Sequence, residues 1–299
     1  MNGIEVVREY KGTYSNWVYV LYSYKIKNRT TIKIKLKNGI SMTVPHEMVF
    51  FIKELSRINK SQSGFEFDSC NGVFTFPYFG KIIKVKFYES GKFNGEFTSF
   101  LGDYDFLEPI EGNTVIDIGA NIGDSSIWFA IKGASKVIAL EPYRWSYNMA
   151  LKNIKINNLF DKVTILNAGY GSTGEIELED LITNVGTELK EHKGGIKTQL
   201  FTLKNILNRS DFVIDGDLLL KMDCEGCEYN LLNEEPDTLR MFKRIIIEYH
   251  YGYEKLITKL KDCNFDVNYT KPHKWYDIDG NRNLVQGYIY AKQINGMST

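Results

Sequence analysis

Residues 115–124 read Val-Ile-Asp-Ile-Gly-Ala-Asn-Ile-Gly-Asp, and this stretch decides the fold. The apolar residues before Gly119 indicate a buried strand, the two glycines indicate a tight turn, and Asp124 indicates the first turn of a helix. The next apolar run ends in a carboxylate, Glu141, 18 residues after Gly123. A carboxylate in that position can accept hydrogen bonds from both hydroxyls of a ribose. The stretch therefore predicts a site for a nucleoside-containing cofactor.

Strands and helices alternate along the chain from residue 111 onward. The expected strands are 114–118, 137–141, 163–167, 218–222 and 244–249, and the expected helices are 124–132, 143–157, 203–207 and 253–263. This alternation implies right-handed crossovers and a parallel sheet. Two further runs, 265–269 and 284–291, suit an antiparallel pair at one edge. We therefore expect an α/β fold with a doubly wound, mainly parallel seven-stranded sheet. The loop 171–198 is expected to be the most flexible stretch.

Before residue 110 the pattern predicts a smaller, mostly β domain, so we expect domains at 1–110 and 111–299. One helix is expected at 14–27, and further strands at 73–76 and 82–88, the first ended by Pro77. The region is rich in Phe and Tyr, which favours an aromatic core or a lid over a stacking platform for sugars or bases.

A hairpin is expected near the start of the N-terminal domain. Two runs of period two, 32–36 and 40–44, flank Lys37-Asn38-Gly39. A two-residue loop would mix the faces of the two strands. A three-residue loop with Gly39 in the left-handed conformation pairs Leu36 with Ile40 and Ile34 with Met42, so we expect that loop.

Composition narrows the class of protein. Lys+Arg and Asp+Glu each number 37, so the formal net charge is zero and a dedicated nucleic-acid binder is disfavoured. The N-terminus lacks the apolar core of a signal peptide, and the apolar runs fall short of the roughly 20 residues that span a bilayer. The four cysteines, at 70, 224, 227 and 263, form no dense framework. We therefore expect reduced thiols and a cytoplasmic location.

The glycine turn indicates which kind of cofactor the site binds. A dinucleotide site requires Gly-x-Gly-x-x-Gly, whereas this turn has only Gly119 and Gly123, and Asp124 would repel a pyrophosphate. S-adenosylmethionine (SAM) has no phosphate. Gly119 would let the backbone approach its methionine part, Asp117 would offer an acceptor to its ammonium, and Glu141 would bind its ribose. The alternative is a turn that only links strand to helix.

Three blocks of sequence resemble a known family. They are Val115–Ser125, Lys136–Pro142 and Lys221–Glu228, and in order and spacing they are similar to the FkbM family of SAM-dependent methyltransferases. The resemblance covers about residues 95–270. It implies the class I methyltransferase fold and O-methylation of sugars, glycans or polyketide-type natural products. It also implies that Asn121, which replaces the middle glycine of the broader class I pattern, and Gly123 belong to the cofactor site. On the same basis Glu96 is expected to close over the site and to contact substrate.

The third block places ionisable residues after two apolar strands. Asp223 and Glu225 follow 218–222, while Glu248 and His250 end the next strand. Carboxyl ends of neighbouring parallel strands share one edge of the sheet, where such folds bind ligands. We expect His250 to be the general base, with Glu248 or Asp223 orienting it or binding substrate hydroxyls, and Glu225 contacting substrate. The alternatives are a hydrogen-bonded strand-end histidine and, for Asp223 and Glu225, helix capping.

Three weaker sequence signals also concern the site. Mg²⁺ is compatible with the acidic cluster but is not favoured, because no dedicated ligand spacing is present, and no metal ligands are assigned. Cys224 and Cys227 form Cys-x-x-Cys without a second pair, which favours small buried side chains over zinc or redox chemistry. Asn167 follows the third strand where adenine would lie, or it simply ends that strand in a turn.

Three classes of function remain from the sequence. The favoured one is a SAM-dependent O-methyltransferase acting on a carbohydrate or glycosylated metabolite. The second is methylation of a nitrogen or of DNA by the same fold; adenine and cytosine amino-methyltransferases carry Asn/Asp-Pro-Pro-Tyr/Phe where this chain has Asp223-Cys-Glu-Gly226. The third is a protein that binds SAM without catalysis. The sequence leaves the acceptor and the oligomeric state open.

Overall fold

The computed structural model describes residues 3–25, 30–89, 92–93, 98–182, 188–276 and 283–294. The chain divides into two compact units, Met1–Gly102 and Asp103–Thr299, called here unit 1 and unit 2. Glu96, which the sequence suggested as a substrate contact, lies outside the described residues.

Unit 1 contains short strands and three α-helices. Its helices are α1 (Gly3–Thr13), α2 (Trp17–Lys25), α3 (Met48–Ile58) and the 3-10 helix η1 (Thr98–Leu101). Its strands are β1 (Thr31–Lys35), β2 (Ser41–Pro45), β3 (Glu66–Asp68), β4 (Val73–Tyr78), β5 (Lys81–Lys86), β6 (Tyr88–Glu89) and β7 (Lys92–Phe93). Phe65, Phe74, Phe76 and Phe100 are buried and lie against one another. The aromatic residues of this unit therefore form a core.

The hairpin prediction is confirmed. Ile34 pairs with Met42, and the N–H of Leu36 donates to the carbonyl of Ile40 at 2.8 Å. Gly39 has φ of 92°, the left-handed conformation that the three-residue loop requires.

The helix expected at 14–27 is present as the shorter α2, but a second helix, α1, precedes it and was not expected. The two are separated at Tyr14, which makes an isolated bridge with Leu36 and donates its hydroxyl to the carbonyl of Val49 at 2.6 Å. Helix α3 was not foreseen at all. Its apolar residues recur at helical spacing, and Met48 and Ile52 are fully buried.

Pro77 does not end its strand as expected. Strand β4 continues through it to Tyr78, and Pro77 pairs with Ile82 of β5. On the other side of β4, β3 pairs only with Val73–Thr75. At Pro77 the strand therefore has a partner on one side only, and the missing N–H interrupts no second ladder.

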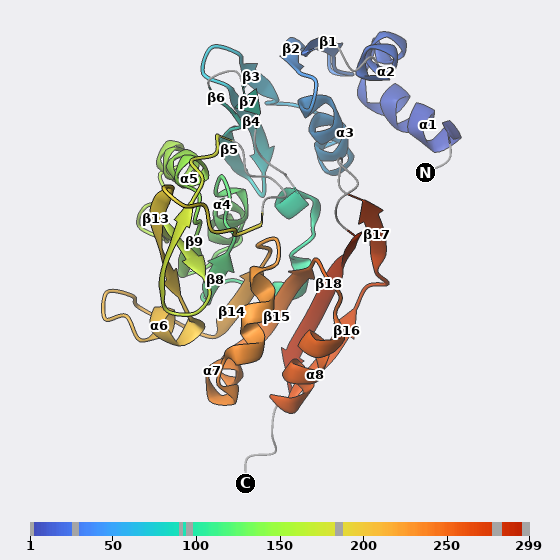
Figure 1. The fold of residues 1–299 in the computed structure, drawn as a ribbon. Helices are drawn as coiled ribbons and strands as arrows, with labels where there is room; N and C mark the ends of the chain where they lie inside the picture. The colour runs from blue at the N-terminus through green and yellow to red at the C-terminus, as the bar shows by residue number, and fades with distance from the viewer. Residues whose placement is uncertain are drawn as a thin grey trace. The chain divides into compact units, whose positions relative to one another are not determined.

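Unit 2 is built on a seven-stranded path with the order β10-β9-β8-β14-β15-β18-β16, and β17 pairs with β18 (Figure 1). Its strands are β8 (Thr114–Ile118), β9 (Lys136–Leu140), β10 (Val163–Leu166), β14 (Leu218–Met222), β15 (Phe242–Tyr249), β16 (Phe265–Tyr269), β17 (His273–Tyr276) and β18 (Asn283–Gln293). The first five are parallel, and β18 runs antiparallel between β15 and β16. The predicted doubly wound, mainly parallel sheet is confirmed.

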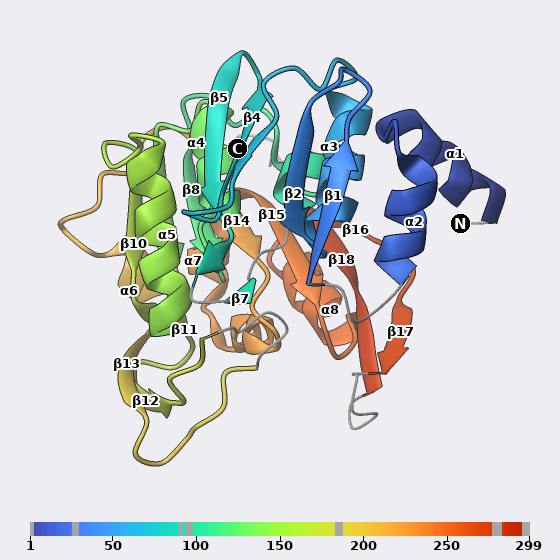
Figure 2. The ribbon, with the colours of Figure 1, turned by 90° about the horizontal axis from the view of Figure 1, so that it is seen from above.

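Helices cover this sheet. They are η2 (Asp105–Leu107), α4 (Asp124–Ile131), α5 (Arg144–Ile156), α6 (Leu203–Leu207), η3 (Cys227–Asn233), α7 (Pro236–Arg240) and α8 (Glu254–Asp262). Helices α4 and α5 pack along β8, β9 and β10, whereas α8 packs along β16 (Figures 1 and 2). Strand β8 is buried at every residue because helices and neighbouring strands surround it.

The loop expected at 171–198 contains structure. Strand β12 (Gly174–Leu178) pairs antiparallel with β13 (Ile196–Phe201), and β13 pairs parallel with β11 (Ala168–Tyr170). The alternation of apolar and polar residues in these segments is too short to predict strands from the sequence. In the structure, Leu178 and Thr198 are buried.

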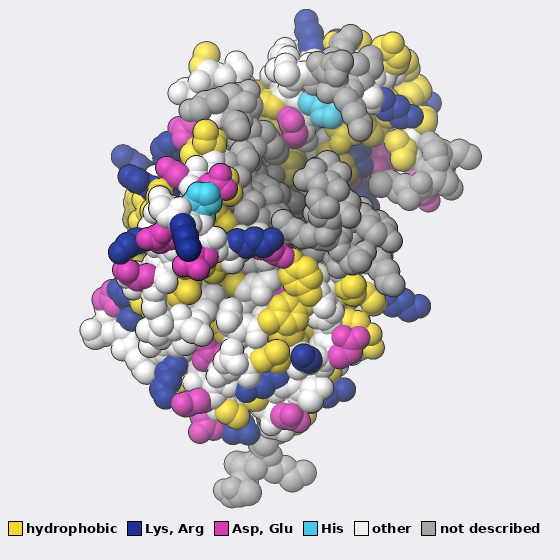
Figure 3. Space-filling model, viewed as in Figure 1, with side chains coloured by type: hydrophobic (Ala, Val, Ile, Leu, Met, Phe, Trp, Pro, Cys, Tyr) yellow, Lys and Arg dark blue, Asp and Glu magenta, His cyan; other side chains and the backbone are white. Residues whose placement is uncertain are grey.

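The surface of unit 2 in Figure 3 shows basic and acidic side chains interspersed, in keeping with the zero formal charge. Among the helices in the described ranges, none has the length and apolar character that a membrane span requires.

Candidate functional site

Two turns meet at the point where the strand order of the sheet reverses. Strand β8 lies between β9 and β14, so the turn after β8 adjoins the turn after β14. A Cβ atom added to Gly119 would lie 1.8 Å from the carbonyl oxygen of Asp223, and Gly119 has φ of 79°. Only glycine fits this position. The first and third sequence blocks are therefore in direct contact at the switch point, where doubly wound sheets bind their ligands.

The carboxylate of Glu141 is held under the glycine turn. The N–H of Asn121 donates to Glu141 Oε2 at 2.9 Å, and the N–H of Tyr143 donates to Oε1 at 2.9 Å. Asn121 has φ of 47°, so the turn presents its N–H to the neighbouring strand. Glu141 is 3% exposed. Both carboxylate oxygens are thus oriented by backbone N–H groups at the end of the second strand.

Gly123 and Asn167 support this arrangement. Gly123, with φ of 84°, precedes α4, and an added Cβ would lie 3.1 Å from the Cβ of Ala150 in α5. The side-chain amide of Asn167 donates to the carbonyls of Glu141 at 3.0 Å and Pro142 at 2.9 Å. Gly123 thus lets the turn pack closely on α5, and Asn167 fixes the backbone around Glu141.

Asp117, in strand β8, is completely buried. Its Oδ2 accepts from the hydroxyls of Ser125 at 2.7 Å and Ser126 at 2.6 Å, and its Oδ1 lies 3.1 Å from Lys221 Nζ. The sequence suggested that Asp117 would face a ligand ammonium. In the structure its contacts tie β8 to the start of α4 and to β14.

Lys221 is a site residue that sequence reasoning did not single out. It is 1% exposed, and its ammonium donates to the carbonyl of Gly119 at 2.7 Å. Burial by itself lowers the pKa of Lys221, but the carboxylates of Asp117 and Asp223 raise that pKa above its ordinary value. Lys221 is therefore a buried cation that locks the glycine turn to β14. A lone lysine inside the apolar strand Leu218–Met222 was the available signal.

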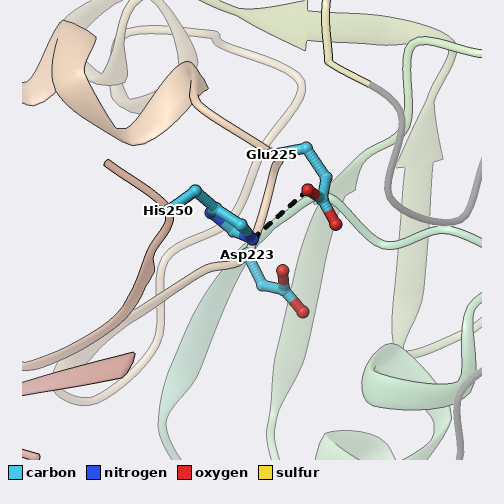
Figure 4. A group of neighbouring side chains, drawn as sticks. All are labelled: Asp223, Glu225 and His250. Atoms are coloured by element: carbon cyan, nitrogen blue, oxygen red, sulfur yellow. Dashed lines mark ion pairs between the residues drawn. The ribbon is translucent and has the colours of Figure 1, made fainter. Parts of the chain in front are cut away.

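Three ionisable side chains converge after β14 and β15. One ligand atom from each of Asp223, Glu225 and His250 lies within 4.8 Å of the other two (Figure 4). Asp223 and Glu225 are half-buried, whereas His250 is 1% exposed. The predicted convergence from two neighbouring strands is present for these three residues.

Glu228 holds His250 from behind. The ring Nδ1 of His250 lies 2.9 Å from Glu228 Oε1, which also accepts from the His250 backbone N–H at 3.0 Å. Burial alone lowers the pKa of His250, but the hydrogen bond and charge of Glu228, followed by the charge of Glu225, raise that pKa to about 10. The imidazolium is then the dominant form near neutrality. His250 as general base stays a prediction and requires that Nε2 lose its proton.

Glu248 does not belong to this three-residue group. Its carboxylate accepts a hydrogen bond from the amide of Gln286. The hydroxyl of Tyr104 donates to Asp223 Oδ2 at 3.4 Å. Burial, followed by the charge of Asp223, raises the pKa of Tyr104 well above its ordinary value, so the phenol stays protonated. Tyr104 is a second residue near the site that the sequence did not suggest.

Cys224 and Cys227 form a disulfide, so the expectation of reduced thiols is wrong for this pair. The free cysteines are Cys70 and Cys263. The three-residue spacing crosses a sharp turn in which Glu225 has φ of 54° and Gly226 has φ of 107°, and this turn brings the two Cα atoms to 5.4 Å. A sequence pattern does not reveal that approach.

A doubly wound sheet with a glycine turn and a buried carboxylate at its switch point defines a Rossmann-like domain of the class I methyltransferase type. The chain belongs to the FkbM methyltransferase family, since the family model "Methyltransferase FkbM domain" matches residues 117–267, about half of the chain.

Individual relatives match shorter parts. Ribosomal protein L11 methyltransferase of Carboxydothermus hydrogenoformans is 33% identical over 82 residues, which are 26% of this chain and 27% of that protein. Uncharacterized protein 158B of Sulfolobus islandicus rod-shaped virus 1 is 28% identical over 141 residues, 47% of this chain and 63% of that protein. The chain thus spans less than two thirds of either relative. The solved structure of M. jannaschii TYW2 in complex with AdoMet is 18% identical, with a TM-score of 0.40, and the match covers 75% of this chain and 88% of that one.

Proposed function

We propose that the protein transfers a methyl group from SAM to a hydroxyl of a sugar, glycan or glycosylated metabolite. The observation that carries the proposal is the Glu141 carboxylate, which lies under the glycine turn with both oxygens oriented by backbone N–H groups. An oriented carboxylate at the end of the second strand is suited to a ribose diol.

The charges of the site fit SAM better than a dinucleotide. Asp124 is buried in the first turn of α4, and Asp223 lies across the turn from Gly119. These carboxylates favour an ammonium and a sulfonium and disfavour a pyrophosphate. When bound, SAM supplies an electrophilic methyl group.

The remaining roles fall to residues at the two turns. Gly119, Asn121 and Gly123 shape the cofactor turn, while Asp117 and Asn167 position it through their contacts with α4 and with the backbone after β9. Asp223 and Glu225, both half-buried, are assigned to the binding of acceptor hydroxyls. Proton removal is assigned to the group of Asp223, Glu225 and His250, and Glu248, in β15 two residues before His250, is assigned to the binding of acceptor hydroxyls.

An oxygen acceptor is supported by the residues after β14. The segment is Asp223-Cys-Glu-Gly226 rather than the Asn/Asp-Pro-Pro-Tyr/Phe of amino-directed enzymes. Carboxylates pair readily with several hydroxyls of one carbohydrate, and the zero net charge does not favour a nucleic acid. A substrate-binding or lid role for residues 1–110 and a cytoplasmic location belong to the same proposal.

Titration calorimetry tests the cofactor assignment. SAM or S-adenosylhomocysteine should bind the wild-type chain. Glu141→Gln should weaken binding about 10- to 100-fold, since the variant amide points N–H groups at the N–H of Asn121 or Tyr143 and removes a charged acceptor. Glu177→Gln, on strand β12, is the matched control. Equal affinity in wild-type and Glu141→Gln protein would remove the assignment.

Transfer of a labelled methyl group into cell extract tests the activity and the acceptor. Label in a glycan or sugar fraction is expected. Label in protein or on nitrogen would replace the acceptor class, whereas SAM binding without transfer to any fraction would indicate a non-catalytic SAM-binding protein.

A further inference from the structure

We propose that Asp223, Glu225 and His250 bind a hexacoordinate divalent cation of the Mn²⁺ or Mg²⁺ type. Figure 4 shows the ends of the three side chains turned toward one another from two strand ends. His250 Nε2 and Glu225 Oε2 are 3.4 Å apart. In an octahedron with bonds of about 2.1 Å, adjacent ligands are about 3 Å apart and opposite ones about 4.2 Å. The spacing of His250 and Glu225 is close to that of adjacent ligands, and one oxygen of Asp223 lies within 4.8 Å of both.

The Nε2 atom of His250 provides independent support. It is buried, and within the part of the chain that the structure describes it makes no hydrogen bond. A buried polar atom without a hydrogen bond is costly, so such atoms commonly mark a ligand site. This atom faces the two carboxylates, where a cation would complete its coordination.

The contact behind His250 is the one that metal-binding histidines usually have. Glu228, which is fully buried, accepts from Nδ1 and so fixes the orientation of the ring. A binding metal ion would displace the proton from Nε2, and the carboxylate on Nδ1 would then direct the Nε2 lone pair toward the metal and make it a better ligand. The set therefore contains both the ligands and the residue that orients one of them.

The donor atoms indicate which cation fits. Two carboxylates and one imidazole leave three positions of an octahedron for water or hydroxyl oxygens. Cys224 and Cys227 flank Glu225 but are joined in a disulfide, so neither supplies the thiolate that a soft metal prefers. The disulfide also closes the turn that holds Glu225 at φ of 54°. With two carboxylates and one imidazole the ligand atoms are mainly oxygen, which favours Mn²⁺ or Mg²⁺.

The open positions give the cation a role in the methyl transfer. Asp223 belongs to the turn after β14, which contacts Gly119 of the cofactor turn. Acceptor hydroxyls bound there would be oriented toward the cofactor turn and made more acidic. This role rests on the proposed function, whereas the binding of the cation does not.

The test is Mn²⁺ binding by the full chain without SAM or acceptor. Mn²⁺ alone is titrated and followed by calorimetry and by loss of the electron paramagnetic resonance signal of the free ion. One saturable site is expected. Asp223→Asn and Glu225→Gln should each weaken it more than about tenfold, and Glu228→Gln about 10- to 100-fold. Glu191→Gln, an exposed residue of the same unit, should bind like wild type.

SAM titration of the same proteins in a chelator keeps this inference separate from the proposed function. SAM should bind the wild-type and Glu225→Gln proteins, and circular dichroism should show that Asp223→Asn and Glu225→Gln are folded. Absence of saturable Mn²⁺ binding, or equal Mn²⁺ affinity in Asp223→Asn, Glu225→Gln and wild-type proteins, would overturn the cation site and leave the SAM assignment standing. Absence of SAM binding to the wild-type protein would overturn the proposed function, whatever the Mn²⁺ titration shows.

Discussion

The two halves of the site are held together by different kinds of contact. After β8 and β9, main-chain groups dominate: backbone N–H groups orient Glu141, and the backbone of Gly119 touches that of Asp223. After β14 and β15, side chains hold side chains: Glu228 holds His250, and a disulfide closes the turn of Glu225.

This difference indicates that the two halves have separate functions. The half after β8 and β9, whose contacts are made by the backbone, tolerates little variation in shape. It therefore suits a ligand that does not vary, such as the cofactor. A half built from side chains can change its chemistry without altering the sheet. We therefore expect substitutions in the first half to affect SAM binding and folding, and substitutions in the second half to affect the cation and the acceptor.

The largest effect is expected for Gly119→Ala. An added Cβ meets the Asp223 carbonyl oxygen at 1.8 Å, so the two turns must separate. Gly112→Ala is the matched control, since Gly112 has φ of 77° but nothing within 4 Å of an added Cβ. The control should lose about 1–2 kcal/mol in urea unfolding. Gly119→Ala should lose several times more, together with SAM binding. Equal losses would show that the close approach is unimportant.

Lys221→Met tests the ion pair that joins the two halves. It leaves the carboxylate of Asp117 buried without its cation, which should cost about 3–5 kcal/mol in the free energy of unfolding. The double variant Lys221→Met with Asp117→Asn should recover part of that loss. The free energies of unfolding are measured in urea. If the loss in the double variant equals the sum of the losses in the two single variants, the two residues are not coupled.

A smaller effect is expected from the disulfide. Replacing Cys224 and Cys227 by serine opens a very short loop, so stability should fall by about 2 kcal/mol. Mn²⁺ affinity should fall as well, because the turn of Glu225 loosens, while SAM affinity stays within a factor of about two. Cys70→Ser, at an exposed free cysteine, is the control. A large loss of SAM affinity would contradict the separation of the two halves.

The sequence predicted the backbone-built half well, because its features are local. A strand, a glycine turn and a carboxylate at the next strand end are all readable from residue types and spacing, and the structure has them at Gly119 and Glu141. The side-chain half depends on contacts across the fold. The contact of Glu228 with His250 spans 22 residues, and the ion pair of Lys221 with Asp117 joins two strands. No spacing rule gives such partners.

The most direct test of the central claim is a crystal structure of the protein with S-adenosylhomocysteine. The account predicts that the ribose hydroxyls lie within hydrogen-bond distance of the Glu141 carboxylate and that the sulfur faces the turn of Asp223 and Glu225. A nucleoside bound elsewhere, or a ribose with no contact to Glu141, would contradict it.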